Sequence, residues 1–504
     1  MAMSLVGLAT PVTLSWLSKL VLSFAELPHL KDILKQMKMS IEAKRLSPDQ
    51  RLVHEHEDTL TWTGKNIMLR KGTLALILAV IAEAIATSKA PTRPQITADP
   101  LQPSKAFPVS PPRHQTCFVE PSKKGGDDAR SILNAFKKCN NGGTIVLDQQ
   151  YTICTPLDLR FLKHVDVALT GTVKFCDDIN HWLPRTFQFP FQDGSSWWLW
   201  GGEDINLYGL GTGTIDGNGQ AWYDAHAANS SVKRPLLFVT DGWKGGSITG
   251  LKMRQSPNWH NLIANSSDIL VSDIDIYSRS KSKNFAKNLD GWDTYRSDNL
   301  VIQNSYIDHD DDCVSFKPNS TNIIVQGLVC NSSHGISVGS LGQYPGVFDT
   351  VENLYIYNIS MSNATDGARL KVWPGANVKK PEGWIGGGGE GRVRNVTYER
   401  FFNDNNDGAI KIDQCYGAVS AAECEADPSK VILTDIVFKD IWGKTSKKSD
   451  PVVGSLICSS EDSCDNIRAV NVTVTAPSGK SPKWSCRNMD EELLELSGVG
   501  CVAA

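Results

Sequence analysis

Three consecutive aspartates, Asp310, Asp311 and Asp312, stand next to Cys313 near the middle of the chain. Adjacent carboxylates repel each other, and the repulsion grows when they are even partly buried. Three interpretations therefore compete: a solvated acidic turn, a cation site, and an acid/base pair. Calcium is the cation that such a run could bind, but the alternating aspartates of calcium-binding loops are missing here.

Two more titratable residues lie at matching distances from this run. Asp290 precedes Asp311 by 21 residues, and His334 follows Asp312 by 22 residues. If one coil of a repeating β structure has this length, these residues lie on neighbouring strands about 4.8 Å apart. The sequence therefore predicts one column of carboxylates that ends in an imidazole.

Such a column could hydrolyse a sugar acetal. That reaction needs an acid, which protonates the leaving oxygen, and a base, which activates water. Carboxylates held close together keep one proton near neutral pH, which is the state that the acid needs. Arg369 and Lys371 are two residues apart and so share one face of a strand. They could hold a carboxylate of the substrate, and arginine can do so with two parallel hydrogen bonds.

The elements that must position these residues are short apolar runs, each of which follows a polar turn with Asn or Asp. The intervals between the first apolar residues of the runs are 30, 23, 31, 42, 40 and 31 residues. Such a repeat indicates a solenoid, and the β-rich content predicts one all-β domain, a right-handed parallel β-helix. The register is ambiguous at Ile269, and the counted positions are Leu270, Leu300, Ile323, Leu354, Val396, Ile436 and Ile467.

One helix precedes these strands. Ile132, Leu133, Phe136 and Cys139 lie at helical spacing, and the Asn and Gly residues at 140–143 end the helix. The terminal units of a solenoid must be protected from solvent. We therefore expect this N-terminal helix to cap the open end of the β-helix.

The N-terminal part of the chain divides into three segments. Residues 68–86 begin with basic residues, continue with an apolar stretch and end on small residues, as a signal peptide does. This segment is too short for a membrane span. Residues 1–67 form a doubtful extension, which comes either from a start codon set too early or from a real N-terminal anchor. Residues 87–116 are expected to be a linker or short arm, and residues 117–504 the catalytic domain.

Composition bounds the partners and the compartment. The net charge of −4 provides no basic surface for nucleic acid, which we exclude as a partner. Many sequons together with 12 cysteines indicate a secreted, disulfide-bonded glycoprotein. No CxxC or HxxxH spacing supports a zinc site. The eight sequons are at Asn229, Asn265, Asn319, Asn331, Asn358, Asn363, Asn395 and Asn471.

Close spacing of cysteines predicts three disulfides. The predicted pairs are Cys313 with Cys330, Cys415 with Cys424, and Cys458 with Cys464. The remaining six cysteines could pair in several ways. Proximity favours Cys117 with Cys139 and Cys154 with Cys176, and leaves Cys486 and Cys501 open.

Four short motifs carry a resemblance to a known family. Asn288-Leu289-Asp290, Asp311-Asp312, Ser333-His334-Gly335 and Arg369-Leu370-Lys371 follow one another in the chain. In this order the motifs resemble those of glycoside hydrolase family 28, the polygalacturonases, over roughly residues 117–490. Leu289, Ser333 and Leu370 stand where the family has Thr, Gly and Ile, and none of these changes removes a titrating group.

The resemblance implies a role for each motif residue. Asp311 would be the general acid, Asp290 and Asp312 would activate water, and His334 would tune the protonation of its neighbours. The family inverts the anomeric centre and needs no metal or other cofactor. The residues that would bind galacturonate are Asn288, Arg369, Lys371 and Tyr416.

Two segments resemble the fungal secreted exopolygalacturonases in particular. These segments are "HGISVGSLGQYPG" and "DGARLKVWPG", at residues 334–346 and 366–375. Such enzymes release single galacturonate units from the non-reducing end of pectic polygalacturonate, which requires a groove that is closed at one end. The candidate closing inserts are residues 187–202 and 383–391. We expect a secreted monomer without membrane contact after removal of the signal peptide.

Several alternatives stay open. Within the family, the chain could be an endopolygalacturonase or act on xylogalacturonan or rhamnogalacturonan; a pectate lyase or a non-catalytic pectin-binding β-helix would share the fold. The tryptophan cluster at 197–200 could pack in the core or stack on sugar. Inverting glycosidases usually hold their two carboxyl groups about 6.5–9.5 Å apart. Carboxylates on adjacent coils are expected to lie closer, so that the distance rule would point to retention.

Overall fold

The computed structural model describes residues 90–122 and 125–504. The predicted signal peptide at 68–86 and the doubtful extension at 1–67 lie outside the described residues. Among the residues described, no helix is both long and apolar enough to span a membrane.

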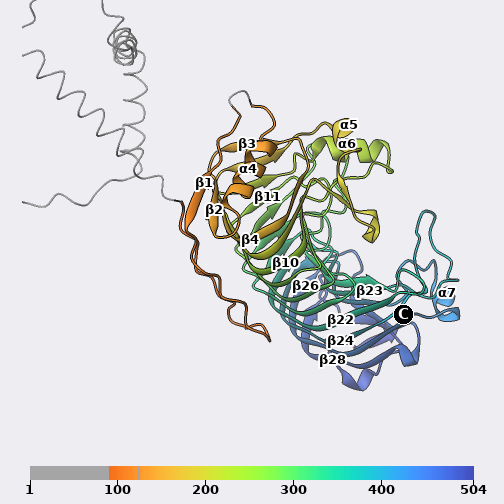
Figure 1. Cartoon of the computed structure of the whole chain (residues 1–504). Coiled ribbons are helices and arrows are strands. Elements are labelled where there is room, and N and C mark those ends of the chain that lie inside the picture. The colour runs from red at the N-terminus through yellow and green to blue at the C-terminus, as the bar shows by residue number, and fades with distance from the viewer. Residues whose placement is uncertain (1–89, 123–124) are drawn as a thin grey trace, which may run out of the picture. The chain divides into compact units, whose positions relative to one another are not determined.

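The described chain coils into a parallel β-helix, as the repeat predicts (Figure 1). Each coil contributes strands to three ladders, in which every strand pairs in parallel with the corresponding strand of the next coil. The first ladder contains β1 Gln115–Phe118, β2 Gly143–Leu147, β4 Leu157–Leu169, β8 Trp198–Tyr208, β10 Phe238–Thr249, β13 Ser267–Ser272, β16 Ser297–Gln303, β19 Ser320–Gln326, β22 Phe348–Ser362, β24 Glu390–Asn406, β26 Lys430–Thr445, β28 Cys464–Thr475 and β30 Leu494–Leu496.

The second and third ladders are made of shorter strands. The second contains β3 Gln150–Ile153, β5 Thr172–Phe175, β9 Thr214–Asp216, β11 Lys252–Arg254, β14 Asp275–Tyr277, β17 Tyr306–Asp308 and β20 Val329–Asn331, after which it continues in the long β22. The third contains β12 Asn261–Ala264, β15 Trp292–Tyr295, β18 Val314–Phe316, β21 Ile336–Leu341, β23 Asp366–Val372, β25 Gly408–Asp413, β27 Val452–Ile457, β29 Lys483–Arg487 and β31 Cys501–Ala503.

Few other elements interrupt the coils. The helices are α4 Ala129–Cys139, α5 Ile179–Trp182, α6 Gln220–Ala228 and α7 Ala421–Ala426, and single 3₁₀ turns lie at Phe191–Asp193, Glu461–Ser463 and Glu491–Leu493. The strands β6 Phe187–Gln188 and β7 Ser195–Ser196 form a small antiparallel pair. α4 is the predicted N-terminal helix: it buries Ile132, Phe136 and Cys139 and packs on β1, β2 and β4.

The register of the first ladder follows the predicted repeat, with one correction. From Leu300 to Ile467 the counted positions pair directly from coil to coil. Leu300, however, pairs with Ile269 and not with Leu270. Each of these positions follows an Asn or Asp with a positive φ, which is Asp268 in this coil. The turn residue therefore sets the register, because Asn and Asp tolerate the left-handed conformation.

The tryptophans of the 187–202 insert pack in the core. Trp197, Trp198 and Trp200 are almost completely buried, and the Trp197 ring stacks on Phe175 at 4.2 Å. Sugar stacking by these three side chains, one of the two alternatives considered, is therefore ruled out by their burial.

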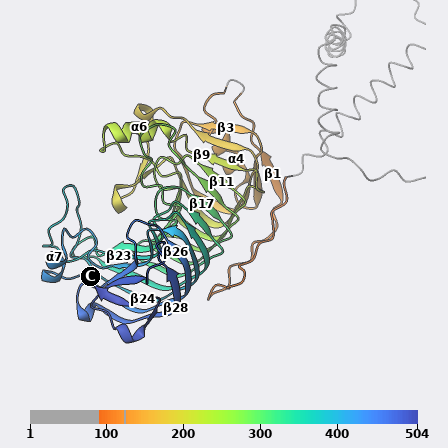
Figure 2. The same cartoon turned by 180° about the vertical axis from the view of Figure 1, so that it is seen from behind.

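The segment before β1 is a packed arm rather than a loose linker. It runs along the stacked coils and turns back to β1 (Figures 1 and 2). Ala98 packs against Leu270 and Val301 of the first ladder. The backbone of the arm exchanges hydrogen bonds with the side-chain amides of Gln303 and Gln326. These bonds add to those that the two buried amides make within the ladder, from Gln303 to Ser272 and from Gln326 to Gln303.

The cysteine pairs agree with prediction except at one place. Disulfides join Cys117–Cys139, Cys313–Cys330, Cys415–Cys424, Cys458–Cys464 and Cys486–Cys501. Cys154 and Cys176 are both thiols, so the pairing that proximity favoured for them is wrong. They follow Ile153 and Phe175, which pair between β3 and β5, so neighbouring coils bring the two residues together without a bond.

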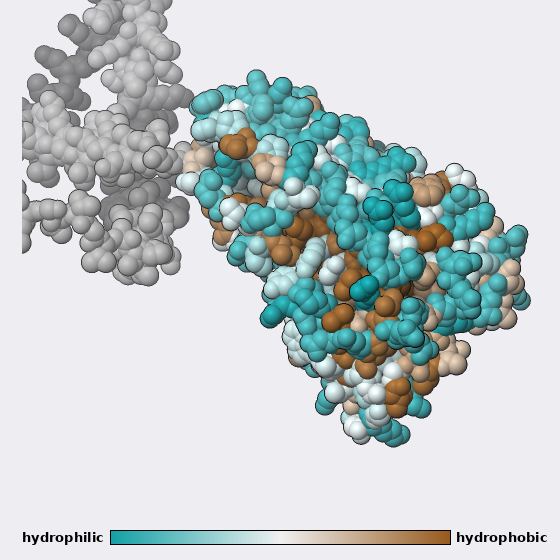
Figure 3. All heavy atoms as spheres, turned by 90° about the horizontal axis from the view of Figure 1, so that it is seen from below, coloured by the Kyte–Doolittle hydropathy of each residue, from teal (hydrophilic) through white to brown (hydrophobic). Residues whose placement is uncertain are grey.

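Hydrophilic residues surround scattered hydrophobic patches on the face shown in Figure 3.

Candidate active site

The turns before the third-ladder strands stack the predicted catalytic residues on successive coils. The Gly291 amide donates to the Asp312 carbonyl at 2.9 Å, and the His334 amide donates to the Asp311 carbonyl at 2.8 Å. These bonds join the coil of Asp290 to that of the aspartate run, and the run to the coil of His334. The spacings of 21 and 22 residues thus correspond to single coils, as expected.

The side chains of Asp290, Asp311 and Asp312 converge. One carboxylate oxygen of each lies within 4.8 Å of the others. This separation is below the range of about 6.5–9.5 Å found between the two carboxyl groups of inverting glycosidases. The expected conflict between coil stacking and the distance rule is therefore present in the geometry.

Asp312 is the most strongly held of the three. Its carboxylate contacts the Lys371 ammonium, accepts from Ser337 Oγ at 2.7 Å and lies 3.8 Å from an Arg369 nitrogen. Burial disfavours the charged carboxylate, but the charges of Lys371 and Arg369 outweigh it and hold the pKa of Asp312 well below its usual value. Asp312 is thus a fixed anion.

Asp290 has the opposite electrostatics. Its side chain is 4% exposed, and burial together with the nearby charges of Asp293 and Asp311 raises its pKa well above the usual value. The Lys317 ammonium opposes this rise from 3.7 Å. The pKa values of two carboxylates of the same column are therefore shifted in opposite directions.

His334 is linked to the middle aspartate. His334 Nδ1 lies 3.2 Å from Asp311 Oδ1, and this hydrogen bond raises the pKa of His334 although burial opposes it. Asp310 points elsewhere: it lies 3.4 Å from Arg279 and does not line the cavity described below, so it is peripheral to the site.

A cavity of about 880 Å³ is lined by Asp290, Asp311, Asp312 and His334. Arg369 and Lys371 lie on its wall from one face of β23, as their two-residue spacing predicts. Asn288 is also on the wall, where its Oδ1 accepts from Arg234 at 2.7 Å. Tyr416 faces Trp373 and Trp384 at ring distances of 5.2 and 5.4 Å. The cavity thus combines a charged floor with an aromatic wall.

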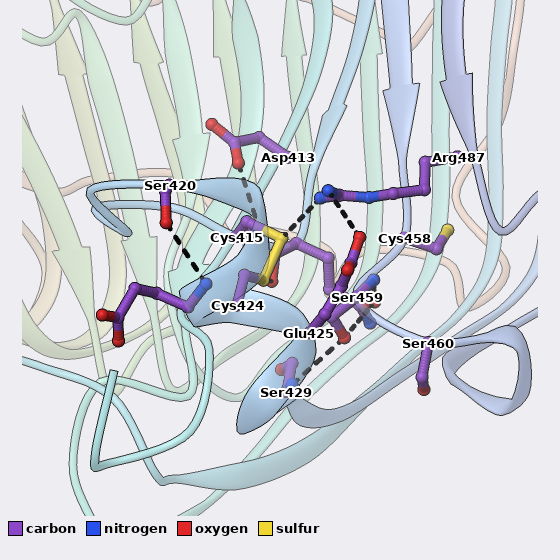
Figure 4. The surroundings of a disulfide bond; sticks show 12 residues. Asp413, Cys415, Ser420, Cys424, Glu425, Ser429, Cys458, Ser459, Ser460 and Arg487 are labelled. Atoms are coloured by element: carbon purple, nitrogen blue, oxygen red, sulfur yellow. Dashed lines mark hydrogen bonds and ion pairs between the residues drawn. A yellow bond between two sulfur atoms is a disulfide. The ribbon is translucent and has the colours of Figure 1, made fainter. Parts of the chain in front are cut away.

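The loop that carries Tyr416 is clamped by a disulfide. Cys415 is bonded to Cys424 at the end of α7, its amide donates to Asp413 at 3.2 Å, and its sulfur accepts from Arg487 (Figure 4). The Tyr416 amide in turn donates to the Val372 carbonyl at 3.0 Å. The clamp fixes the phenol beside Arg369 and Lys371.

Three loops that are distant in the sequence meet at the cavity. Gln192 donates to the Gln343 side chain at 3.3 Å, and Gln343 donates to the Ile385 carbonyl at 3.2 Å. All three residues line the cavity. Both inserts named as closing elements, 187–202 and 383–391, thus contribute to this junction, and the loop of Gln343 joins them.

Some residues of the site were missed by sequence reasoning. Lys317, Trp259 and Asp293 lie in or next to the cavity, with Lys317 Nζ 3.2 Å from Asp293 Oδ1 and 4.9 Å from the Trp259 ring. A signal was available for two of them. Side chains alternate along a strand, so Lys317 should lie on the same face as Ser315, and Asp293 comes three residues after Asp290, on the strand that follows it. Trp259 carries no such signal.

The three converging carboxylates have the spacing of a cation site, but their nearest charged neighbours are cations of the protein. Lys371 contacts Asp312, and Lys317 lies 3.7 Å from Asp290. Calcium needs six to eight oxygen ligands. The two ammonium groups already offset the charge of these carboxylates, so the donor set fits a metal ion poorly.

Comparisons with known proteins agree with this site. The model of "Glycosyl hydrolases family 28" matches residues 155–499. Exopolygalacturonase X-2 of Emericella nidulans is 64% identical over 446 residues, which cover 86% of this chain and 99% of that protein. An exopolygalacturonase of Cochliobolus carbonum is 52% identical over 393 residues, which cover 78% of this chain and 87% of that protein.

A solved structure extends the agreement to the fold. The endo-xylogalacturonan hydrolase from Aspergillus tubingensis is 34% identical, has a TM-score of 0.68 and covers 77% of this chain and 99% of that chain. A polygalacturonase from Erwinia carotovora, at 20% identity and a TM-score of 0.56, has the same fold. The resemblance carried by the four motifs is thereby confirmed: the chain belongs to glycosyl hydrolase family 28.

Proposed function

We propose that the protein is an exopolygalacturonase, which hydrolyses terminal α-1,4-galacturonosyl linkages of pectic polygalacturonate from the non-reducing end. The column of Asp290, Asp311, Asp312 and His334 supports hydrolysis. The curated relatives at 64% and 52% identity carry the name exopolygalacturonase.

In this proposal Asp311 is the general acid. It lies between the coils of Asp290 and His334, and repulsion within a cluster of three carboxylates favours retention of one proton among them. His334 tunes this proton through its hydrogen bond to Asp311. Asp312, held as an anion by two cations, and Asp290 activate the water that attacks the anomeric carbon.

In this proposal, other residues of the cavity wall bind the substrate. Arg369 and Lys371 meet the galacturonate carboxylate, and Tyr416 and Asn288 contact the sugar. Charge-assisted hydrogen bonds of this kind are about twice as strong as neutral ones. A neutral sugar would offer these two cations no charge beyond that of Asp312, so the pair favours a uronic acid over rhamnose beside the scissile bond.

The observation that carries exo action is the junction of Gln192, Gln343 and Ile385 at the cavity. It joins the two inserts and, in this proposal, closes one end of the groove, so that a chain enters only by its terminus. An endo-acting xylogalacturonan hydrolase is the second candidate, supported by the likeness to the Aspergillus tubingensis enzyme, which is lower at 34% identity.

The test is an early product profile on polygalacturonate for the chain from residue 87 onward and for its Asp311→Asn variant. Galacturonate alone from the first minutes, absent with the variant, is the expected result. A ladder of oligomers would overturn exo action and leave the hydrolase. Unsaturated products that absorb in the near ultraviolet would mean a lyase and overturn the proposal.

Secretion, glycosylation and a monomeric state belong to the same proposal. Five disulfides support an oxidising compartment. Six of the eight sequon asparagines are exposed, and Asn319 and Asn331 are half-buried. A glycosidase-sensitive mass shift of protein from the culture medium, together with its elution volume on a sizing column, tests all three points.

A further inference from the structure

One buried ion pair beside the catalytic column has no part in the roles assigned so far. Asp293 lies on β15 and is fully buried, and Lys317, which follows β18, is 5% exposed on its side chain. Lys317 Nζ lies 3.2 Å from Asp293 Oδ1 and 3.7 Å from Asp290 Oδ2. Lys317 also lines the cavity, with its ammonium over the Trp259 ring.

The partners of this pair are few. Neither carboxylate oxygen of Asp293 has a hydrogen bond among the described residues, so the Lys317 ammonium is what offsets its charge there. Within 4 Å of Asp290, in the described part of the chain, Lys317 is likewise the one cation. Two buried carboxylates therefore share a single ammonium.

The other charged groups around Asp290 cannot replace Lys317. Asp311 and Asp312, in the turn before β18, are negative and disfavour a further charge on Asp290. Lys371 and Arg369 of β23 already pair with the Asp312 carboxylate. His334, in the turn before β21, pairs with Asp311, and burial lowers the pKa of His260 to about 4. Arg234 donates to Asn288 and to backbone carbonyls.

We propose that Asp293 and Lys317 are positioning residues for the reaction: Lys317 supplies the positive charge that lets Asp290 ionise in its buried place, and Asp293 fixes Lys317 beside it. This inference rests on the proposed function, since it assigns Asp290 the task of activating water. Burial raises the pKa of Asp293 as well, but Asp293 lies nearer to the ammonium. Asp293 therefore ionises first and Asp290 second, against the charge already present.

The two partners should then affect Asp290 in opposite directions. Without Lys317 the Asp290 carboxylate loses its compensating charge, and ionisation requires a higher pH. Without the charge of Asp293 the Lys317 ammonium interacts with the Asp290 carboxylate alone, so Asp290 ionises at a lower pH. A merely structural pair would not separate the two variants in this way.

The experiment measures kcat and KM across pH for Lys317→Met, Asp293→Asn, the double variant and Lys317→Arg, on polygalacturonate. We expect the acid limb of the kcat profile to move up by about one to three pH units in Lys317→Met, as expected for a charge at about 4 Å. It should move down in Asp293→Asn, and Lys317→Arg should restore the wild-type limb. Lys411→Met, a lysine of the same ladder outside the cavity lining, is the matched control.

Two results would overturn the inference. One is a limb that stays in place, or moves in the same direction, in both single variants. The other is an increase of KM in Lys317→Met at an unchanged limb, which would make Lys317 a ligand of the substrate carboxylate. If Lys317→Met fails to fold, the pH profile is measured for Asp293→Asn and for the double variant, which removes both charges together. These two variants still show in which direction the acid limb of the kcat profile moves. Absence of galacturonate release from the wild type would instead refute the proposed function.

Discussion

Replacement of Gln343 by alanine should open the closed end of the groove. The variant loses two hydrogen bonds, one from Gln192 at 3.3 Å and one to the Ile385 carbonyl at 3.2 Å. A neutral hydrogen bond contributes about 0.5–1.5 kcal/mol net, so the junction as a whole contributes about 1–3 kcal/mol. Both bonds are at least partly exposed, so we use the lower part of this range, about 1–2 kcal/mol. Loss of this free energy should increase the population of molecules with separated loops roughly 5- to 30-fold.

The assay is the product distribution from polygalacturonate within the first few per cent of conversion, resolved by anion-exchange chromatography. Wild type should give galacturonate alone, and Gln343→Ala should add digalacturonate and longer products. Gln192→Ala removes one bond and should fall between the two. The matched control is Gln188→Ala, since Gln188 lies in the same insert and its side-chain amide, among the residues that the structure describes, donates only to Thr186.

The reasoning fails if folded Gln343→Ala still releases galacturonate alone while its total activity is unchanged. In that case the two bonds do not hold the wall. Exo action would then depend on the packing of the inserts, such as the stack of Phe191 on Tyr295 at 3.9 Å.

Three further predictions follow from the site and its support. Proton NMR of early products should show the β-anomer of galacturonate first, because the family inverts; the α-anomer first would mean that the short carboxylate separation reports retention after all. The double variant Cys415→Ser/Cys424→Ser should raise KM more than it lowers kcat, because it loosens the loop of Tyr416; equal effects on both would refute a binding role for the clamp. Arg113→Met should lower the free energy of unfolding in urea by about 1.5–3 kcal/mol, because it removes charge-assisted bonds to Asp166 and Asp204 while Arg93 still pairs with Asp166, with kcat of the folded protein unchanged.

The column of candidate catalytic residues could be predicted because it repeats with the fold. Asp290, Asp312 and His334 are one coil apart, so a count along the chain sufficed to bring them together. The same count failed by one residue at Leu270, where three apolar residues follow Asp268. The positive φ of Asp268 decides the register there, and an apolar pattern alone does not contain that information.

Contacts that do not repeat with the coils could not be predicted. Gln192 and Gln343 are 151 residues apart and lie in loops that belong to no repeat. The arm before β1 reads as a linker because its few apolar residues show no periodicity, yet Ala98 finds a site on the first ladder. Cys154 and Cys176 show the reverse error, since their proximity in the sequence led us to expect a bond that does not form.

The charges of the cavity explain why hydrolysis and uronate binding belong together here. Among the described cavity residues, Lys317, Arg369 and Lys371 each already have a carboxylate within 4 Å. In the proposed mode of binding, a galacturonate carboxylate therefore shares Arg369 and Lys371 with Asp312. Binding then weakens the hold on Asp312 just as the substrate reaches it, and a less compensated carboxylate is a stronger base. A neutral sugar in the same place would leave Asp312 tied to both cations, so the charge of the substrate contributes to catalysis as well as to affinity.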